Sequence, residues 1–270
     1  MPLLSVEHLS VDYRHGATAV RAVDDVSFAI ESGEILALVG ESGCGKTSAA
    51  LALTKLLPTP PASISGHVRF GDLELLRAPS EQLHAVRGGK IAYVFQEPST
   101  SLNPVLTIGE QLLEMVELHT DARGAAARRV VVEWLERVGI TSAVERLHAY
   151  PHEFSGGMQQ RVMLAMAMAA RPALLIADEP TTALDVTIQV QILRLLRDLQ
   201  RTFRLSVLLI SHDLMVVERI AHRVGVMARG QLVELGAVTQ VLRHPVHPYT
   251  RELLRYRSTI TLRRRGMSDG

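Results

Sequence analysis

Four short runs of apolar residues constrain the fold of this chain more than any other feature of its sequence. They lie at residues 35–39, 91–95, 174–177 and 207–210. Each run is nearly continuous instead of alternating between apolar and polar side chains, which is typical of strands buried on both faces of a parallel sheet. Helical patterns separate the runs; in residues 186–201 the apolar side chains recur with the spacing of one helix face. Strands that alternate with helices predict an α/β fold.

The remaining segments predict two additions to this sheet. Residues 3–9 and 20–30 are interrupted, alternating runs, and we expect them to form antiparallel strands. Residues 107–150 contain helical patterns and suit a helical insertion. We expect the tail at residues 261–270 to be frayed.

The composition limits the class of protein to which this sheet belongs. Of the 270 residues, 47% are hydrophobic, yet no run of about 18 apolar residues offers a transmembrane helix, and the N-terminus lacks a signal-peptide pattern. The net charge of +1 argues against a broad nucleic-acid footprint. Cys44 is the only cysteine, which excludes an internal disulfide and a multi-cysteine metal site. We therefore expect a globular protein of the cytosol that is unusually apolar.

A glycine-rich segment follows the first apolar run and predicts a phosphate-binding loop. It fits the pattern G-x-x-x-x-G-K-[ST], with Gly40, Glu41, Ser42, Gly43, Cys44, Gly45, Lys46 and Thr47. The glycines let backbone N–H groups curl round phosphates, and the helix expected at residues 48–57 adds its positive N-terminal end. Lys46 is placed to reach the β- and γ-phosphates, and the Thr47 hydroxyl to ligate Mg²⁺. A glycine-rich turn without a ligand is the alternative, which the position between strand and helix disfavours.

Two acidic residues follow the third apolar run. A strand that ends in aspartate holds Mg²⁺ in P-loop ATPases, so we expect Asp178 to hold the cation. Glu179 is then placed to polarise a water molecule for attack on the γ-phosphate. A pair of solvated acidic residues is the alternative, and the phosphate-binding loop earlier in the chain disfavours it.

The other two runs lead into Gln96 and His212. Ligands of an open parallel sheet bind beyond the carboxyl ends of its strands, so we expect Gly40, Gln96, Asp178 and His212 at one edge. We interpret His212 as a sensor of the γ-phosphate and not as a structural histidine.

A second helix start suited to phosphate lies at Ser155, Gly156 and Gly157. Ser155 can cap the apolar helix that follows, and the two glycines leave backbone N–H groups bare. One ATP does not readily use two such sites in one chain, so a nucleotide sandwiched between two chains explains both. A plain helix cap, the alternative, predicts no need for two glycines.

Taken together, these motifs resemble those of ABC-type ATPase subunits, over roughly residues 3–250. They occur in the family's order: residues 40–47 resemble the Walker A loop, Gln96 the Q-loop, Ser155–Gly157 the signature, Asp178 and Glu179 the Walker B pair, residues 183–185 the D-loop, and His212 the switch histidine. Phe154 and Met158 depart from the commonest signature but leave its serine and glycines in place. Tyr13 matches the aromatic residue that stacks on adenine in this family; an ordinary strand tyrosine is the alternative.

The resemblance implies a P-loop NTPase fold with a parallel core sheet, an N-terminal antiparallel β-subdomain and an α-helical subdomain. It places the ABC domain at residues 1–250, with its core at 1–97 and 165–235, its helical subdomain at about 98–164, and a C-terminal extension at 236–270. It also implies an ATP hydrolase that uses Mg²⁺. The roles implied are catalysis by Glu179, His212 and Gln96, cation binding by Thr47, Gln96 and Asp178, and nucleotide binding by Tyr13, residues 40–47 and residues 155–157.

Two local segments resemble importers for oligopeptides, dipeptides and nickel. They are the Q-loop region at residues 95–104 and the tail motif His-Pro-Val-His-Pro-Tyr-Thr at residues 244–250. The short tail without a cysteine cluster favours nickel- or metallophore-type members over peptide-type ones. The two histidines of the motif suggest a metal site, but its prolines hold the segment extended and favour a structural tail.

This subfamily implies several partners: a second, related but different ATPase subunit, two membrane permeases and an extracytoplasmic solute-binding protein, with no nucleic acid. The chain is then held at the cytoplasmic face of the inner membrane. We expect its docking surface at residues 98–118, where apolar residues concentrate at Leu102, Val105, Leu106, Ile108, Leu112 and Leu113. The alternative is a soluble ABC ATPase acting on nucleic acid or ribosomes, although the 132 positions from Lys46 to Asp178 hold no heptad array for a long coiled coil.

Overall fold

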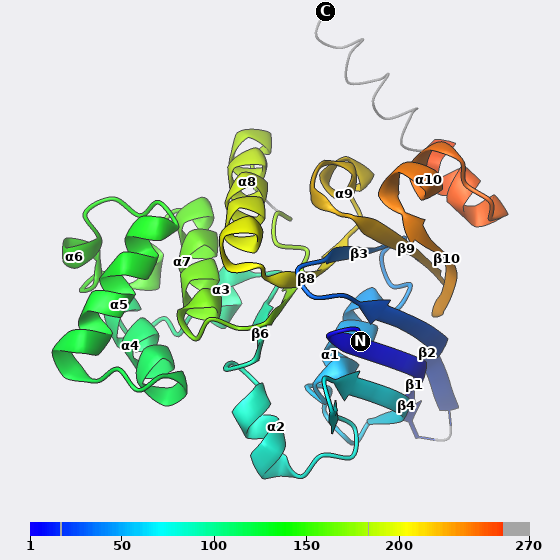
Figure 1. Cartoon of the computed structure of the whole chain (residues 1–270), viewed down its shortest axis with the longest axis horizontal. Helices are drawn as coiled ribbons and strands as arrows, with labels where there is room; N and C mark the ends of the chain where they lie inside the picture. Colours follow the sequence, from blue (N-terminus) through cyan, green and yellow to red (C-terminus); the bar gives the residue numbers. More distant parts are fainter. Residues whose placement is uncertain (17, 183, 256–270) are drawn as a thin grey trace, which may run out of the picture. The chain divides into compact units, whose positions relative to one another are not determined.

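The computed structural model describes residues 1–16, 18–182 and 184–255 of the chain. These residues form two compact units, and Figure 1 labels most of their helices and strands. The first unit combines Met1–Ala78 with the segment from Leu208 onward, and the second is Pro79–Val207. The tail expected to be frayed lies outside the described residues, as does Ala183 of the expected D-loop.

An antiparallel sheet occupies the N-terminal part of the first unit. Its strands lie in the order β2-β1-β4-β5, with β1 at Leu4–His15, β2 at Thr18–Ile30, β4 at Ala62–Phe70 and β5 at Leu73–Glu74. β1 pairs with both β2 and β4, which confirms the antiparallel strands expected near the N-terminus. The register of β1 shifts between Val6 and Leu9, so both side chains are buried although they are an odd number of residues apart.

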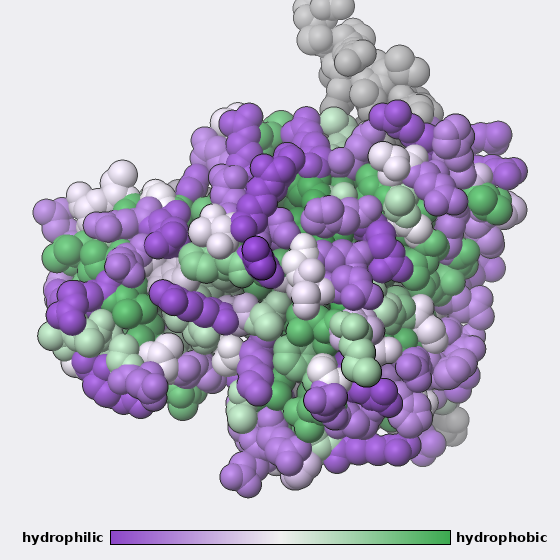
Figure 2. Space-filling view, in the orientation of Figure 1, coloured by the Kyte–Doolittle hydropathy of each residue, from purple (hydrophilic) through white to green (hydrophobic). Residues whose placement is uncertain are grey.

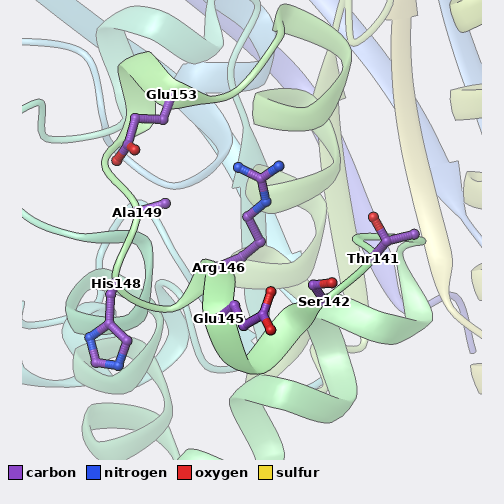
Figure 3. A pocket seen from close by; sticks show the side chains of 7 residues that line it. All are labelled: Thr141, Ser142, Glu145, Arg146, His148, Ala149 and Glu153. Carbon is purple, nitrogen blue, oxygen red and sulfur yellow. The ribbon is translucent and has the colours of Figure 1, made fainter.

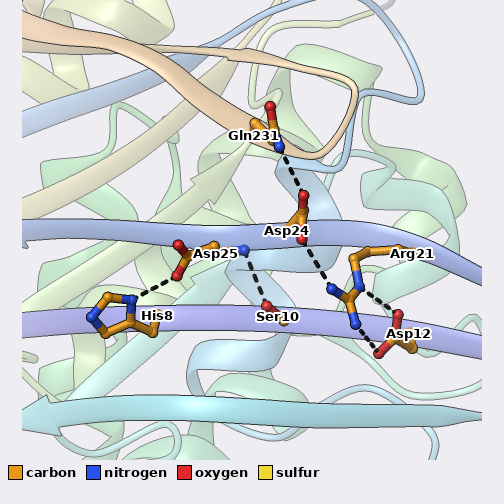
Figure 4. A network of polar contacts seen from close by, with 7 residues as sticks. All are labelled: His8, Ser10, Asp12, Arg21, Asp24, Asp25 and Gln231. Atoms are coloured by element: carbon orange, nitrogen blue, oxygen red, sulfur yellow. Dashed lines mark hydrogen bonds and ion pairs between the residues drawn. The ribbon is translucent and has the colours of Figure 1, made fainter.

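Exposed and half-buried side chains of β1 and β2 form a polar network (Figure 4). Arg21 donates to Asp12 from Nε at 2.9 Å and to Asp24 at 3.1 Å, and the hydrogen bond from Arg21 lowers the pKa of Asp12. Gln231 also donates to Asp24, at 2.8 Å. Because solvent screens exposed pairs, this network contributes little stability, and the buried side chains hold the sheet together.

The first apolar run forms a strand in the same unit. β3 (Ile35–Val39) pairs in parallel with β9 (Arg223–Ala228), and β10 (Gln231–Ala237) runs antiparallel to β9. All residues of β3 are buried, as its continuous apolar sequence predicts. Helices of this unit include α1 (Lys46–Leu53), α9 (Leu214–Ile220) and α10 (Val238–Arg243). Residues 248–255 are helical as well, so the segment at 244–250 is not extended throughout, as its prolines had suggested.

Helix α1 is shorter than the helix expected at residues 48–57. It begins within the glycine-rich segment, because Gly45 adopts a left-handed conformation with φ of 104° and turns the chain directly into the helix. It ends early because Lys55 has φ of 52°, a conformation in which the helix cannot continue.

The second unit contains a parallel pair of strands. β6 (Ile91–Val94) and β7 (Leu174–Asp178) lie side by side, with Ile91 opposite Leu174. The fourth apolar run forms β8 (Ser206–Ser211), whose residues are all buried and which crosses the boundary between the units. The sequence therefore predicted all four of these strands, with ends that differ by one residue at most.

Helices make up most of the second unit. They are α2 (Ser80–Val86), α3 (Pro98–Ser101), α4 (Ile108–His119), α5 (Gly124–Arg137), α6 (Ala143–Arg146), the 3₁₀ turn η1 (Pro151–Glu153), α7 (Gly156–Ala169) and α8 (Val186–Phe203). Helices α4, α5 and α7 pack against one another, and Trp134 of α5 meets Phe203 of α8 with ring centroids 5.3 Å apart. Helices α4 to α6 occupy the region where helical patterns were expected. The expected subdomain bounds stay a prediction, since this unit also contains β6 and β7.

The docking surface expected at residues 98–118 is less apolar than its sequence suggests. Leu102, Ile108 and Leu112 are buried within the second unit, because they face the helices packed against them, while Val105 and Leu118 are 75% and 70% exposed. On the face shown in Figure 2, hydrophobic residues are scattered among hydrophilic ones. In the described part of the chain, no helix has both the length and the apolar character needed to cross a bilayer.

Candidate functional site

The phosphate-binding loop lies between β3 and α1, and its glycines are required by close packing. A Cβ atom on Gly40 would lie 2.2 Å from the carbonyl oxygen of Met227, and one on Gly45 would lie 2.2 Å from that of Ala22. Both glycines also have positive φ, at 154° and 104°. The neighbouring β-strands therefore shape the loop, which any side chain at these two positions would distort.

Lys46 is folded into the loop. Its side chain is buried, and Nζ donates to the carbonyl oxygens of Gly40 at 2.9 Å and Glu41 at 2.8 Å. The Thr47 hydroxyl belongs to an exposed residue at the start of α1, and Glu41, Ser42 and Gly43 are exposed as well. A phosphate on the loop can thus replace the two carbonyl groups as the partner of the ammonium group.

Tyr13 and His212 belong to the same unit as the loop. The Tyr13 hydroxyl lies 3.1 Å from Ser48 Oγ, which places the half-buried tyrosine beside the first turn of α1. His212 follows β8 and is exposed, directly before Asp213, whose side chain caps α9 by accepting from the N–H of Met215 at 2.7 Å. Contact of Tyr13 with adenine and of His212 with the γ-phosphate stay predictions.

The acidic pair lies at the end of β7 in the second unit. Asp178 is buried, and the hydroxyl of Tyr93 on the neighbouring β6 donates to its Oδ2 at 3.0 Å. Burial, the charge of Asp178 and this hydrogen bond all raise the pKa of Tyr93, so the tyrosine remains a donor. One carboxylate oxygen of Asp178 is therefore oriented by a side chain that the sequence analysis did not single out.

Gln96 and Glu179 are brought together in this unit. Gln96 Nε2 donates to Glu179 Oε2 at 3.3 Å, and the Thr182 hydroxyl donates to the same oxygen at 2.8 Å. Glu179 has φ of 46°, an uncommon conformation for a residue with a side chain, and such backbone is frequent at functional sites. The expected catalytic glutamate thus has two hydrogen-bond donors on one oxygen.

The serine and glycines at residues 155–157 start α7, as expected. Ser155 caps the helix by accepting from the N–H of Met158 at 3.4 Å. A Cβ on Gly157 would lie 2.7 Å from a methyl group of Ile188 on α8, whereas one on Gly156 would meet only Leu184 at 3.6 Å. Packing therefore gives a reason for Gly157 that does not involve phosphate, which weakens the argument that two glycines alone imply a ligand.

The site residues fall into two groups, one in each unit. Tyr13, residues 40–47 and His212 belong to the first unit, and Gln96, residues 155–157 and Asp178 with Glu179 belong to the second. That they share one edge of a sheet stays a prediction. The sequence did not lead us to predict Tyr93 or Thr182 as site residues. It offered a signal for Thr182 alone, which lies three residues after Glu179, and none for Tyr93.

A shallow pocket of about 380 Å³ also lies in the second unit, and Figure 3 shows its side chains. It is lined by Thr141, Ser142, Glu145, Arg146, His148, Ala149 and Glu153. None of the expected site residues lines it, and it carries charges of both signs. Among the described residues there is also no group of three or more histidine, cysteine or acidic side chains placed to hold a metal ion.

Comparisons with known proteins identify the family. A sequence model described as ABC transporter matches residues 23–182. The chain is 54% identical over 94% of its length to a peptidoglycan transport ATP-binding protein, YejF, of Agrobacterium fabrum. It is 47% identical over 93% of its length to the oligopeptide transport ATP-binding protein OppD of Bacillus subtilis. The chain spans about half of the first relative (46%) and 71% of the second.

A solved structure supports the same assignment. The dimeric, post-hydrolysis ATP-binding cassette MJ0796, bound to ADP and phosphate, matches with a TM-score of 0.77 and 26% identity. The match covers 87% of this chain and 98% of that one, so the likeness extends over the whole cassette fold. With its phosphate-binding loop and paired carboxylates in place, the chain belongs to the ABC transporter family and has the fold of that family's ATP-binding cassette.

Proposed function

We propose that this chain is the ATP-binding and ATP-hydrolysing subunit of an ABC importer. The observation that carries the proposal is the hydrogen-bonded Glu179, next to Asp178, in a cassette with a complete phosphate-binding loop. A carboxylate held in place beside the reaction is what a general base requires. The energy of ATP would then drive transport through separate membrane subunits.

The loop binds the phosphates, and the carboxylates act on the cation and the attacking water. Lys46 exchanges its carbonyl partners for phosphate oxygens, and the backbone N–H groups of the loop bind the remaining charge. Glu179 accepts the proton of the attacking water, and Gln96 and Thr182 hold its carboxylate in position. His212 senses the γ-phosphate, and Tyr13 supports the adenine.

The donor set of the chain fits Mg²⁺. Thr47 is an exposed residue that carries a hydroxyl, and Asp178 offers a carboxylate whose Oδ2 is already oriented by Tyr93. Oxygen ligands of this kind, together with phosphate oxygens, are those that Mg²⁺ prefers. Thr47, Gln96 and Asp178 would hold the ion, which supplies neutralisation of the phosphate charge when bound.

The proposed partners follow from the exposed signature and from the relatives. Ser155 and Gly156 are exposed at the start of α7, where they are available to the nucleotide of another cassette. The dimeric state of MJ0796 supports such a pair, and we infer a related but different ATPase subunit as partner. Two permeases and an extracytoplasmic binding protein complete the importer, with this chain at the cytoplasmic face of the inner membrane.

We place di- and oligopeptides first among the cargoes. The two relatives described above are named for peptidoglycan and oligopeptide transport, which supports a cargo containing peptide bonds. Nickel or metal chelates come second, because neither of these relatives is named for them. An uptake assay separates the two: in cells without this chain, labelled peptide uptake should be lost and nickel uptake retained. Loss of nickel uptake alone would reverse the order, and retention of both would contradict both proposed cargoes.

ATP binding is tested by Lys46→Ala. The substitution removes the ammonium group that we assign to the phosphates, and we expect the Kd for a fluorescent ATP analogue to rise at least tenfold. Lys90→Ala, which removes an exposed lysine outside the loop, is the matched control and should leave the Kd unchanged. Equal affinities of wild type and Lys46→Ala would overturn the assignment of the loop.

A further inference from the structure

The histidine- and proline-rich segment at residues 244–250 is a motif that the proposed hydrolysis does not use. It follows α10 in the first unit and is anchored to β10. Both carboxylate oxygens of Glu234 accept from its backbone, Oε1 from the N–H of Val246 at 2.9 Å and Oε2 from that of His247 at 3.0 Å. One side chain of β10 thus fixes two successive residues of the segment.

The anchor is charged at neutral pH. Burial raises the pKa of Glu234, but the nearby Thr250 hydroxyl and the N–H groups of Val246 and His247 outweigh this and leave the pKa below its usual value. Hydrogen bonds to an ionised carboxylate are stronger than those between neutral groups. The segment is therefore held firmly at this point.

From this anchor the segment reaches the phosphate-binding loop. Nδ1 of His247 accepts from the N–H of Tyr249 at 3.2 Å, at the point where the helical residues 248–255 begin. The hydroxyl oxygen of Tyr249 then accepts from the N–H of Glu41 at 3.4 Å. Tyr249 is half-buried, and this hydrogen bond joins it to a residue that lies 208 positions earlier in the chain.

The contact lies at the peptide that Lys46 also holds. Lys46 Nζ binds the carbonyl oxygens of Gly40 and Glu41, and it must give up these partners to bind phosphates. The bond from Glu41 to Tyr249 does not involve the lysine, so it can persist when Lys46 turns away. It would then keep the start of the loop in the shape that receives the nucleotide.

We propose that Tyr249 is a positioning residue for the phosphate-binding loop, held there by the 244–250 segment and its anchor Glu234. The proposal rests on the proposed function only in that the loop binds ATP. It assigns the tail motif a role in nucleotide affinity and not in the chemical step. Loss of the contact should therefore raise the KM for ATP and leave kcat nearly unchanged.

Tyr249→Phe tests the contact in the full chain, because it removes one hydroxyl and keeps the ring. We expect the Kd for ATP to rise about threefold to fivefold, in line with the loss of one neutral hydrogen bond, with kcat within about twofold. The matched control is Tyr150→Phe, at an exposed tyrosine of the second unit, which should bind ATP as the wild type does. Unchanged affinity in Tyr249→Phe would overturn the proposal.

A double-mutant cycle tests the route through the anchor. Glu234→Gln loosens the segment and should weaken ATP binding to a similar extent, and the double variant Glu234→Gln/Tyr249→Phe should be no weaker than Glu234→Gln alone. Effects that multiply would contradict a shared route. Failure of the wild type itself to bind ATP would refute the proposed function, whereas normal binding in every variant would refute only the role of Tyr249.

Discussion

At the residue scale, the two carboxylates of the candidate site are oriented by neighbouring side chains that are not acidic. Asp178 is oriented by Tyr93 from the adjacent strand, and Glu179 by Gln96 and Thr182. A carboxylate with one oxygen already bonded has fewer orientations to lose when it binds a cation or a water molecule. These neighbours therefore restrict the orientation of both carboxylates before any nucleotide binds.

The substitution Tyr93→Phe tests whether the Tyr93 hydroxyl orients Asp178 for the cation. The ring and its packing against Phe95, with centroids 4.4 Å apart, are retained, and only the bond to Asp178 is lost. Hydrogen bonds to charged groups contribute about 1.5–3 kcal/mol, and the lower end of this range corresponds to a rise of at least about tenfold in the Mg²⁺ concentration for half-maximal nucleotide binding. The measurement is a Mg²⁺ titration of fluorescent ATP binding.

Binding without Mg²⁺ is the internal control for this variant. Nucleotide affinity measured in EDTA should equal that of the wild type, because Tyr93 acts through Asp178 alone. A uniform loss of affinity with and without Mg²⁺ would show general damage to the second unit instead. An unchanged Mg²⁺ requirement would show that the hydroxyl does not orient the carboxylate for the cation.

At the element scale, a side-chain cap fixes where helix α4 begins. Thr107 caps α4 with a capping box: its hydroxyl accepts from the N–H of Glu110 at 3.2 Å, and the Glu110 carboxylate accepts from the N–H of Thr107 at 2.7 Å. The backbone hydrogen bond from Thr107 and that from its hydroxyl lower the pKa of Glu110. Helix α4 therefore begins within the segment at residues 98–118, which is expected to meet the permeases.

Thr107→Ala should lower the free energy of unfolding by about 1 kcal/mol, because the helix loses its capping side chain. Urea unfolding followed by circular dichroism measures the change. Ser142→Ala is the control, since Ser142 also precedes a helix but makes no side-chain capping bond, and it should change stability little. Equal effects of the two substitutions would show that the capping box contributes nothing specific.

The strands were more predictable than the ends of the helices. Continuous apolar sequence marked β3, β6, β7 and β8, because strands buried on both faces tolerate few polar residues. β9 and β10 were not foreseen, and β10 is only half-buried, so its sequence lacks a clear pattern. The early end of α1 depends on the backbone of Lys55, which no side-chain pattern indicated.

At the scale of the whole molecule, the high apolar content has a simpler origin than a large docking surface. The buried hydrophobic residues fill the interiors of both units, including Leu102, Ile108 and Leu112 of the segment expected to face the permeases. Val105 and Leu118 remain exposed there. A partner at this segment would therefore meet a small apolar contact surrounded by polar residues.

Glu179→Gln tests the proposed cycle at this scale. The amide keeps the shape of the side chain but cannot accept a proton, so we expect ATP binding without turnover and a stable ATP-dependent pair of cassettes. Size-exclusion chromatography with light scattering, with the proposed partner subunit and ATP, measures the pair. Lys46→Ala should form no such pair, and near-normal hydrolysis in Glu179→Gln would show that another group activates the water.

The sequence by itself determined the positions of the phosphate-binding loop, the acidic pair and the strands that precede them. These features are local, because the spacing of a few glycines or the end of an apolar run is enough to specify them. Only the tertiary structure decided which side chains hold them: Tyr93 lies 85 positions from Asp178, and Tyr249 lies 208 positions from Glu41. The first pair meets because β6 and β7 are neighbouring strands, and the second because the 244–250 segment packs against the loop within the first unit. No local sequence pattern indicates either contact.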